Sequence, residues 1–250
     1  MLILLPPSET KRPGGEGRAL DLSALALPSL LPQRQSVVDA LVRLCADDPD
    51  RAAKVLKLSP RQHGELEGNA RLRESATRPA VDRYTGVLFD ALDAGSLQPA
   101  ARRWLGAHVL VHSAPFGPVG ALDPIPAYRL AAGVSLPGLP SLTRVWADAV
   151  TDALAALDAK LVLDLRSEAY AVLGPVPAGV PSAYVRVVSE TDDGTVRALN
   201  HFNKHAKGAF VRDLARARPR SSSLAGLRRW AAGAGWTLRP GAPGEIELVV

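Results

Sequence analysis

Polar side chains that could carry acid–base chemistry or bind an anion occur in three segments, each following a predicted buried strand or the loop that leaves it. The segments are Ser8-Glu9-Thr10-Lys11, Tyr128-Arg129 and Ser167-Glu168-Ala169-Tyr170. Open α/β sheets bind ligands at the carboxyl ends of their strands, because loops from several strands converge there. Each segment alone is more typical of a solvated turn, so the prediction of one shared cleft depends on all three.

A basic helix from about Phe202 to Ala217 is the fourth predicted part of this cleft. Its apolar stripe is Phe202, Ala206, Phe210 and Leu214, and its opposite half carries Lys204, His205, Lys207, Arg212 and Arg216. We therefore expect Lys207 to be exposed, so that truncating it changes stability by no more than about 0.5 kcal/mol. Gly208 costs roughly 1 kcal/mol in a helix interior. It indicates a close approach, either by a ligand or by a neighbouring strand.

Other familiar catalytic and metal-binding patterns are absent. Gly14-Gly15-Glu16-Gly17 fits neither dinucleotide-binding nor P-loop spacing. His108 and His112 fall in one predicted strand, about 13 Å apart, which is too far for one metal ion. His201 and His205 could pair on a helix, but only one carboxylate, Asp213, is near them in the sequence. We expect no metal and no cofactor.

Positive charge is concentrated near the carboxyl terminus. The segment from Arg197 to Arg229 holds nine of the 30 Lys and Arg residues and one of the 25 acidic residues, whereas the whole chain has a net charge of +5. Such asymmetry is typical of a surface that faces an anion, either nucleic acid or a phosphorylated small molecule. A solvated basic helix without a ligand is the alternative.

Strand and helix patterns alternate along the chain. Continuous apolar runs at 1–5, 107–112 and 160–165 predict buried strands, and a hairpin is expected at 184–199 around Asp193-Gly194. Ser36, Ser141 and Ser223 are placed to cap helices. Strands are also expected at 236–238 and 245–250. The pattern predicts an α/β fold with a mixed central sheet flanked by helices and a basic cleft at the strand ends.

The composition is that of a globular chain. Its 250 residues are 47% hydrophobic and 22% charged, and Cys45 is the only cysteine. A disulfide scaffold and a cysteine-based zinc site are therefore excluded. No apolar run approaches a membrane span, and the start lacks a signal-peptide pattern. We expect one domain over residues 1–250, a cytoplasmic location, no membrane partner and a monomer.

Several motifs, in order, resemble the YaaA family of peroxide stress proteins. They are Met1–Lys11, the tyrosine-threonine-glycine turn in Asp82–Gly86, Pro124–Leu130, the tryptophan-containing Val145–Asp148, the serine–acid–x–tyrosine motif ending Leu163–Tyr170, and Phe202–Gly208 with Arg212. The resemblance runs from residue 1 to about 240. Many members carry a serine-proline-alanine-lysine-threonine loop, whereas here Lys11 stands two places further along.

This resemblance implies a cytoplasmic protein that limits oxidative damage to DNA and binds DNA through a positive cleft. The family is also described as having a helix-hairpin-helix element that contacts DNA. The best match here is Lys54–Arg71, around Leu58-Ser59-Pro60, which lacks the usual hairpin glycine. Arginine outnumbers lysine 24 to 6, and its planar fork suits phosphate, but aromatic residues are only 5%. We expect sequence-tolerant contact with the duplex backbone.

Two functional hypotheses follow. In the first, the anion-binding residues contact DNA; they are Lys11, Arg129, Ser167, Lys204, Lys207 and Arg212. In the second, the same cleft belongs to an enzyme for a small phosphorylated or nucleoside-like substrate. The catalytic residues would then be Glu168, Tyr170 and Ser8, with Glu168 as a general acid or base if burial raises its pKa. Both hypotheses place Ser8, Arg129, Ser167, Glu168, Lys207 and Arg212 around one cleft.

Overall fold

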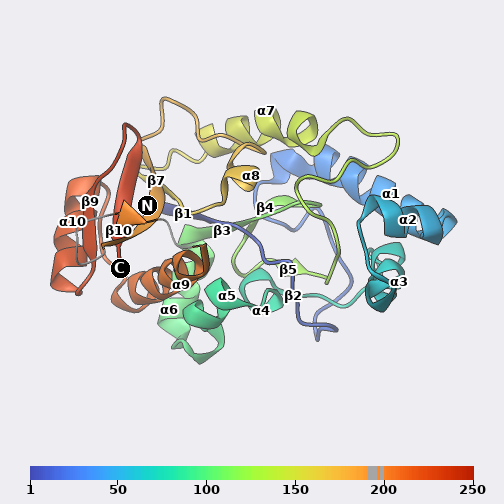
Figure 1. Cartoon of the computed structure of the whole chain (residues 1–250), viewed down its shortest axis with the longest axis horizontal. Coiled ribbons are helices and arrows are strands. Elements are labelled where there is room, and N and C mark those ends of the chain that lie inside the picture. Colours follow the sequence, from blue (N-terminus) through green and yellow to red (C-terminus); the bar gives the residue numbers. More distant parts are fainter. Residues whose placement is uncertain (191–195, 198–199) are drawn as a thin grey trace.

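A mixed β-sheet forms the centre of the molecule (Figure 1). The computed structural model describes residues 1–190, 196–197 and 200–250. In this part of the chain the strand order is β4-β3-β1-β6-β7-β10-β9, and β8 pairs with β7 beside it. The strands are β1 (Leu2–Leu5), β3 (Val109–Ser113), β4 (Gly117–Gly120), β6 (Val162–Asp164), β7 (Ser182–Glu190), β8 (Val196–Arg197), β9 (Thr237–Pro240) and β10 (Glu245–Val249). A separate small sheet pairs β2 (Arg78–Pro79) with β5 (Pro124–Ile125). The predicted α/β fold, with a mixed central sheet flanked by helices, is confirmed.

The inner strands are parallel, and this arrangement positions the site. β1 pairs in parallel with β3 and β6, and β7 pairs in parallel with β6 and β10. Antiparallel β4 and β9 form the two edges. Every residue of β1 is buried, as its continuous apolar run predicts. The segments that follow β1, β3 and β6 therefore leave the same edge of the sheet.

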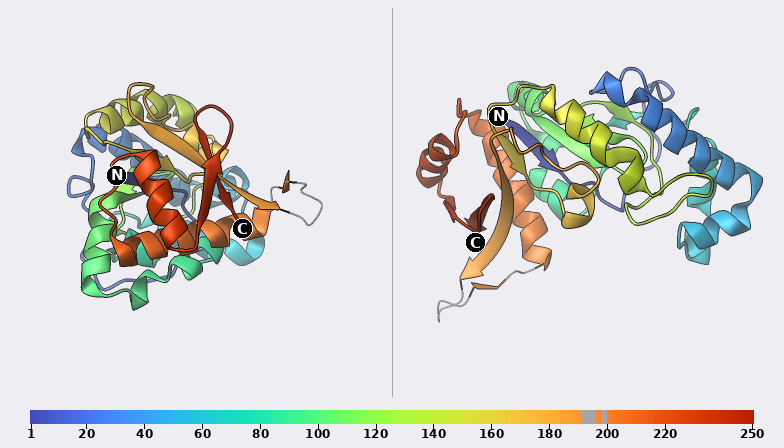
Figure 2. Two further views of the ribbon diagram at one scale, coloured as in Figure 1. Left: turned by 90° about the vertical axis from the view of Figure 1, so that its left-hand side faces the viewer. Right: turned by 90° about the horizontal axis from the view of Figure 1, so that it is seen from above.

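Helices cover both faces and extend beyond the sheet. They are α1 (Leu31–Asp47), α2 (Pro49–Val55), α3 (Gly64–Ala70), α4 (Ala80–Arg83), α5 (Val87–Leu92), α6 (Pro99–His108), α7 (Leu142–Ala155), α8 (Glu168–Ala171), α9 (Asn200–Ala217) and α10 (Leu224–Gly233), with single 3-10 turns η1 (Pro28–Leu30), η2 (Pro60–Gln62) and η3 (Ala94–Ser96). Figure 1 shows α7 on one side of the strands and α5, α6 and α9 on the other. The helices α1–α3 lie at one end of the molecule and α10 at the other, and the end of β7 projects from the body (Figure 2).

Two of the predicted helix caps are confirmed. Ser141 and Ser223 accept hydrogen bonds from backbone amides at the starts of α7 and α10. The prediction for Ser36 was wrong, because α1 begins at Leu31 and the Ser36 hydroxyl donates to the Pro32 carbonyl inside the helix. Pro32, at the start of α1, has a fixed φ angle that suits the first turn of a helix, so the helix begins before Ser36.

The two central histidines do not share a strand, contrary to the prediction. His108 is the last residue of α6, where its ring stacks on Trp104, and only His112 belongs to β3. The strand therefore starts two residues later than expected. The hairpin turn expected at Asp193-Gly194 lies outside the described residues, but the antiparallel pairing of β7 with β8 on either side agrees with it.

Candidate functional site at the strand ends

The loop after β1 is closed by Lys11. Its Nζ donates to the carbonyls of Ser8 and Glu9, at 3.0 and 3.1 Å, and lies 4.1 Å from the centroid of the Tyr128 ring. Burial lowers the pKa of Lys11 to about 7, and the positive charge of Arg129 contributes to that decrease. The displaced lysine of this loop is thus an inward-facing group that holds the loop's own backbone.

A pair of buried tyrosines lies beneath Lys11. The hydroxyls of Tyr84 and Tyr128 are 2.8 Å apart, and burial raises the pKa of both. Tyr170 lies nearby, with its ring centroid 6.0 Å from that of His112. Burial raises the pKa of Tyr170, and Tyr128 contributes to that increase. These phenols stay neutral at physiological pH and can only donate or accept hydrogen bonds.

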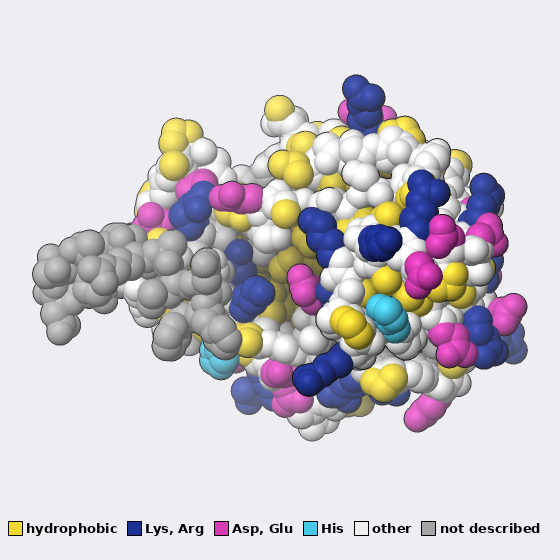
Figure 3. Space-filling view, turned by 45° about the vertical axis from the view of Figure 1, so that its right-hand side comes forward, with side chains coloured by type: hydrophobic (Ala, Val, Ile, Leu, Met, Phe, Trp, Pro, Cys, Tyr) yellow, Lys and Arg dark blue, Asp and Glu magenta, His cyan; other side chains and the backbone are white. Residues whose placement is uncertain are grey.

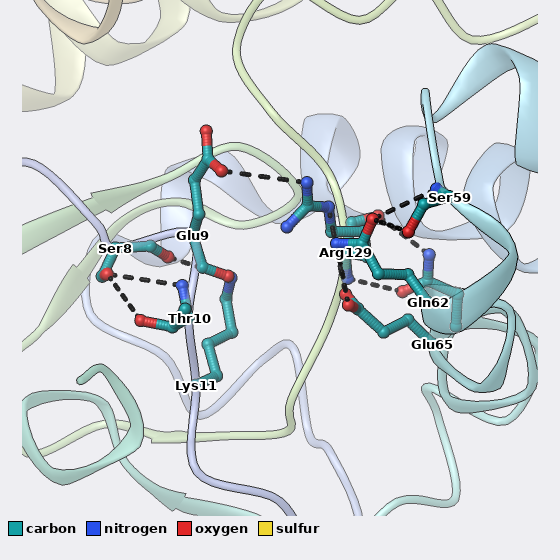
Figure 4. Close-up of polar contacts among 9 residues, drawn as sticks. Ser8, Glu9, Thr10, Lys11, Ser59, Gln62, Glu65 and Arg129 are labelled. Carbon is teal, nitrogen blue, oxygen red and sulfur yellow. Dashed lines mark hydrogen bonds and ion pairs between the residues drawn. The ribbon is translucent and has the colours of Figure 1, made fainter. Parts of the chain in front are cut away.

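Arg129 connects this loop to α3. Its guanidinium lies 3.8 Å from a Glu9 carboxylate oxygen and 3.9 Å from one of Glu65 (Figure 4). The side-chain amide of Asn69 holds the Arg129 backbone, accepting from its N–H and donating to its carbonyl, both at 2.8 Å. Nothing in the sequence pattern singled out Asn69, since a buried amide that pairs with a distant backbone leaves no local signal.

A buried ion pair builds the end of β6. Arg166 donates to both carboxylate oxygens of Asp164, at 2.8 and 2.6 Å, and also to the carbonyl of Gly174. A third contact of 2.8 Å joins it to His112 Nδ1. Because a guanidinium can only donate, His112 is neutral with its proton on Nε2. Burial and then Arg166 lower the pKa of His112. Sequence reasoning missed this network.

Lys207 is buried, and the expectation that it is exposed was wrong. Only 6% of the residue is accessible, and its Nζ donates to the carbonyl of Leu165 at 3.0 Å. Burial lowers the pKa of Lys207 to about 8, partly opposed by the negative charge of Asp164. The helical wheel failed here because α9 contacts the end of the sheet on one side and α5 on the other.

Ser167 and Glu168 lie at the start of α8 and are exposed. The Glu168 side chain is 80% exposed and lies 3.9 Å from Arg186, which is itself paired with Glu245. Glu168 therefore lacks the burial that the general acid–base hypothesis required. Neither Tyr184, which donates to the Arg166 carbonyl, nor Arg186 was selected from the sequence.

Arg212 points to a different part of the molecule from Lys207. It donates to the carbonyls of Leu92 and Asp93, at 2.9 and 2.8 Å, and to the hydroxyl of Ser96, and it pairs with the Asp93 carboxylate at 3.2 Å. These contacts fasten α9 to the end of α5. Lys204, two turns earlier in α9, is exposed. The structure thus brings Ser8, Lys11 and Arg129 together and directs Arg212 elsewhere.

A hollow is visible from the side toward which β1 runs (Figure 3). Its floor is hydrophobic, and Lys and Arg side chains lie along its edges with a few acidic side chains among them. Within the described residues, no group of three His, Cys, Asp or Glu side chains could hold a metal ion, and His201 lies outside the side chains described. None of the helices in this part of the chain has the length and apolar character needed to span a membrane.

Comparison with known proteins identifies the family. The family model described as peroxide stress protein YaaA matches residues 1–241. A UPF0246 protein of Corynebacterium efficiens is 46% identical over the full length of both chains. A UPF0246 protein of Streptomyces coelicolor is 44% identical over 86% of this chain and 82% of its own, and one of Polynucleobacter asymbioticus is 28% identical over 85% and 84%. The chain therefore belongs to the YaaA family of peroxide stress proteins, as its motifs predicted.

Proposed function

We propose that this protein acts in the cytoplasm during peroxide stress and binds duplex DNA through the hollow at the strand ends. The family name supports the link to peroxide. The observation that carries DNA binding is the set of Lys and Arg side chains around the hollow in Figure 3. These cations would contact backbone phosphates, so we expect little sequence preference.

The basic segment does not act as one surface. Lys207 is buried, Arg212 is bound to the end of α5, and Arg228 donates to the Leu238 carbonyl. Lys204 and Arg216 are both exposed on α9. They are separated by twelve residues, which is about 18 Å along a helix. Only the Lys204 end lies near the strand ends, where Lys207 meets Leu165.

The segment between α2 and α3 offers a second contact. The family is described as using a hairpin between two helices, and the glycine usual in such a hairpin is missing here. Lys57 in this turn has a φ of 55°, a conformation that glycine adopts far more readily. Lys54, Lys57 and Arg61 are exposed around this turn. We propose that they extend the DNA-binding surface.

Gel retardation of duplex DNA at several salt concentrations tests the proposal. Contact with three to five phosphates predicts a log–log salt slope of about −3 to −5. Lys204→Ala should weaken binding equally for all sequences and make the slope shallower by about one. Arg216→Ala is the matched control, because it also removes an exposed cation, but from the far end of the same helix. The absence of retardation, or an equal loss in the control, would contradict the proposal.

An enzyme for a small phosphorylated or nucleoside-like substrate is the second candidate. It is favoured by the buried tyrosines Tyr84 and Tyr128, whose hydroxyls are 2.8 Å apart, since a duplex backbone touches surface groups. A thermal-shift screen of nucleotides separates the two. Stabilisation by a mononucleotide with no retardation of DNA would favour the enzyme.

A further inference from the structure

Lys207 takes a position in the sheet that a backbone N–H would normally occupy. The parallel register of β1 and β6 pairs Leu4 with Asp164, and the N–H of Leu165 donates to the carbonyl of Leu4. In a parallel ladder the Leu165 carbonyl would next accept the N–H of residue 6. Residue 6 is proline, which has no N–H. The carbonyl accepts Lys207 Nζ instead, so this ammonium lies where the loop after β1 begins.

Three hydroxyl groups gather further along: Ser8 and Thr10 of the same loop, and Thr85 of the turn between α4 and α5. Thr10 Oγ1 lies 3.3 Å from Ser8 Oγ and 3.0 Å from Thr85 Oγ1. These distances are longer than the usual 2.7–2.8 Å, so weak contacts hold the cluster and its hydroxyls can turn toward a ligand. Gly86 lies next to it with a φ of 95°, and a Cβ there would come 3.3 Å from Ser8 Oγ.

The packing of α5 on α9 brings the hydroxyls and the lysine together. Gly208 faces the Leu88 carbonyl, and Arg212 bonds the Leu92 carbonyl, so the two helices run in the same direction. The first turn of α5, which begins directly after Gly86, therefore lies beside the α9 residues around Lys207. The close approach that Gly208 predicted is made by a helix, not by a ligand or a strand.

The charge of Lys207 is available to a ligand. Both carboxylate oxygens of nearby Asp164 already accept hydrogen bonds from the Arg166 guanidinium. Within the described part of the chain, Lys207 Nζ makes one hydrogen bond, although an ammonium has three N–H groups. Among the described residues, this buried cation has one hydrogen bond and a Tyr184 ring 5.6 Å away, and it lies at the start of the loop that carries Ser8 and Thr10. A cation and hydroxyls on one loop match the needs of a tetrahedral oxyanion.

We infer that Lys207 Nζ and the hydroxyls of Ser8, Thr10 and Thr85 form a binding site for a phosphate group. This inference extends the proposed function, because the same site would hold one phosphate of a DNA strand; the phosphate of a free small molecule has the same chemistry. Ser8 and Lys207 thereby bind an anion, and neither acts as a nucleophile or a base.

Titration calorimetry with inorganic phosphate at constant ionic strength tests the site, beside gel retardation of duplex DNA. Lys207→Met keeps the apolar stem and removes the charge, and it should weaken phosphate binding at least about tenfold, as expected for a charged hydrogen bond. Thr85→Val should weaken it several-fold at similar volume. Thr85→Ser is the matched control, because it retains the hydroxyl and should bind phosphate like the unmodified chain. Circular dichroism verifies that each variant is folded.

Each outcome separates the site from the proposed function. Phosphate binding that depends on Lys207 and Thr85, in a chain that does not retard DNA, supports the site with a small molecule as its source and refutes DNA binding. Retardation of DNA without phosphate binding overturns the site and leaves DNA binding in place. The same conclusion follows if DNA is retarded and Lys207→Met and Thr85→Val bind phosphate as well as the unmodified chain does. Weakening of both ligands by both variants supports both.

Discussion

Replacement of Arg166 by methionine should destabilise the protein strongly. Arg166 is fully buried, and its guanidinium makes hydrogen bonds to both oxygens of Asp164, to His112 and to the Gly174 carbonyl. Methionine fills much of the volume but leaves the Asp164 carboxylate, whose side chain is 8% exposed, without this partner. Removing one member of a buried ion pair typically costs about 3–5 kcal/mol, because the remaining charge stays desolvated.

Urea unfolding measures this loss directly. For a chain of this length, a loss of 1 kcal/mol in the free energy of unfolding lowers the melting temperature by about 2–4 °C. The melting temperature of Arg166→Met should therefore fall by roughly 6–20 °C. The double variant Asp164→Asn, Arg166→Met should lose less than the sum of the two single changes, by about 1–3 kcal/mol, because the charge that needed Arg166 is gone. A loss below about 1 kcal/mol in Arg166→Met, or strict additivity, would refute the view that buried Asp164 depends on Arg166 as its partner.

Three further predictions concern the same region. Glu9→Gln should tighten DNA binding several-fold at low salt and hardly at high salt, because the carboxylate beside Arg129 repels phosphate. Retardation gels at two salt concentrations measure this effect, and weaker binding by the variant would contradict it. Gly208→Ala should lower the free energy of unfolding by about 1–3 kcal/mol, because its Cβ would lie 2.1 Å from a carbonyl oxygen of α5. The control Gly68→Ala, which lies in open space on α3, should not destabilise the protein; urea unfolding measures both. The pKa of Lys11 is about 7 in the folded chain and 10.5 without the fold, so the unfolded state binds more protons between these values and the free energy of unfolding should rise with pH across that window. Lys11→Met should flatten that rise in urea unfolding at neutral and alkaline pH, and an identical rise would show that Lys11 is not its source.

The sequence alone predicted the layers of the fold well. The buried strand at Leu2–Leu5 and the caps at Ser141 and Ser223 follow from local patterns. A short continuous apolar run favours a strand buried on both faces, and a serine hydroxyl bonds the free amides of the helix that follows it. The loops after β1 and β6 were also found locally. Prolines or polar residues end each apolar run, so the sheet edge at which these loops leave could be located from the sequence.

Burial of charged groups could not be predicted in the same way. Lys207 and Arg212 lie on one helix and look alike in the sequence, yet one donates to the end of β6 and the other to the end of α5. A helical wheel assumes one buried face, and α9 has neighbours on two sides. Which neighbour a side chain meets depends on elements that lie far away in the sequence, since Arg212 bonds Leu92 and Lys207 bonds Leu165.

What the sequence by itself determined, then, is the order of strands and helices, the family, and the loops that bear polar side chains, because these depend on short-range periodicity and on motifs. Only the tertiary structure decided how those side chains are used. The sequence contains both Pro6, which has no N–H, and Lys207, which has an ammonium. Nothing in the sequence reveals that the Leu165 carbonyl, left without the N–H of residue 6, accepts the Lys207 ammonium instead. That pairing exists because parallel strands place residues distant in sequence in one hydrogen-bond ladder, and burial then requires each polar group to find a partner.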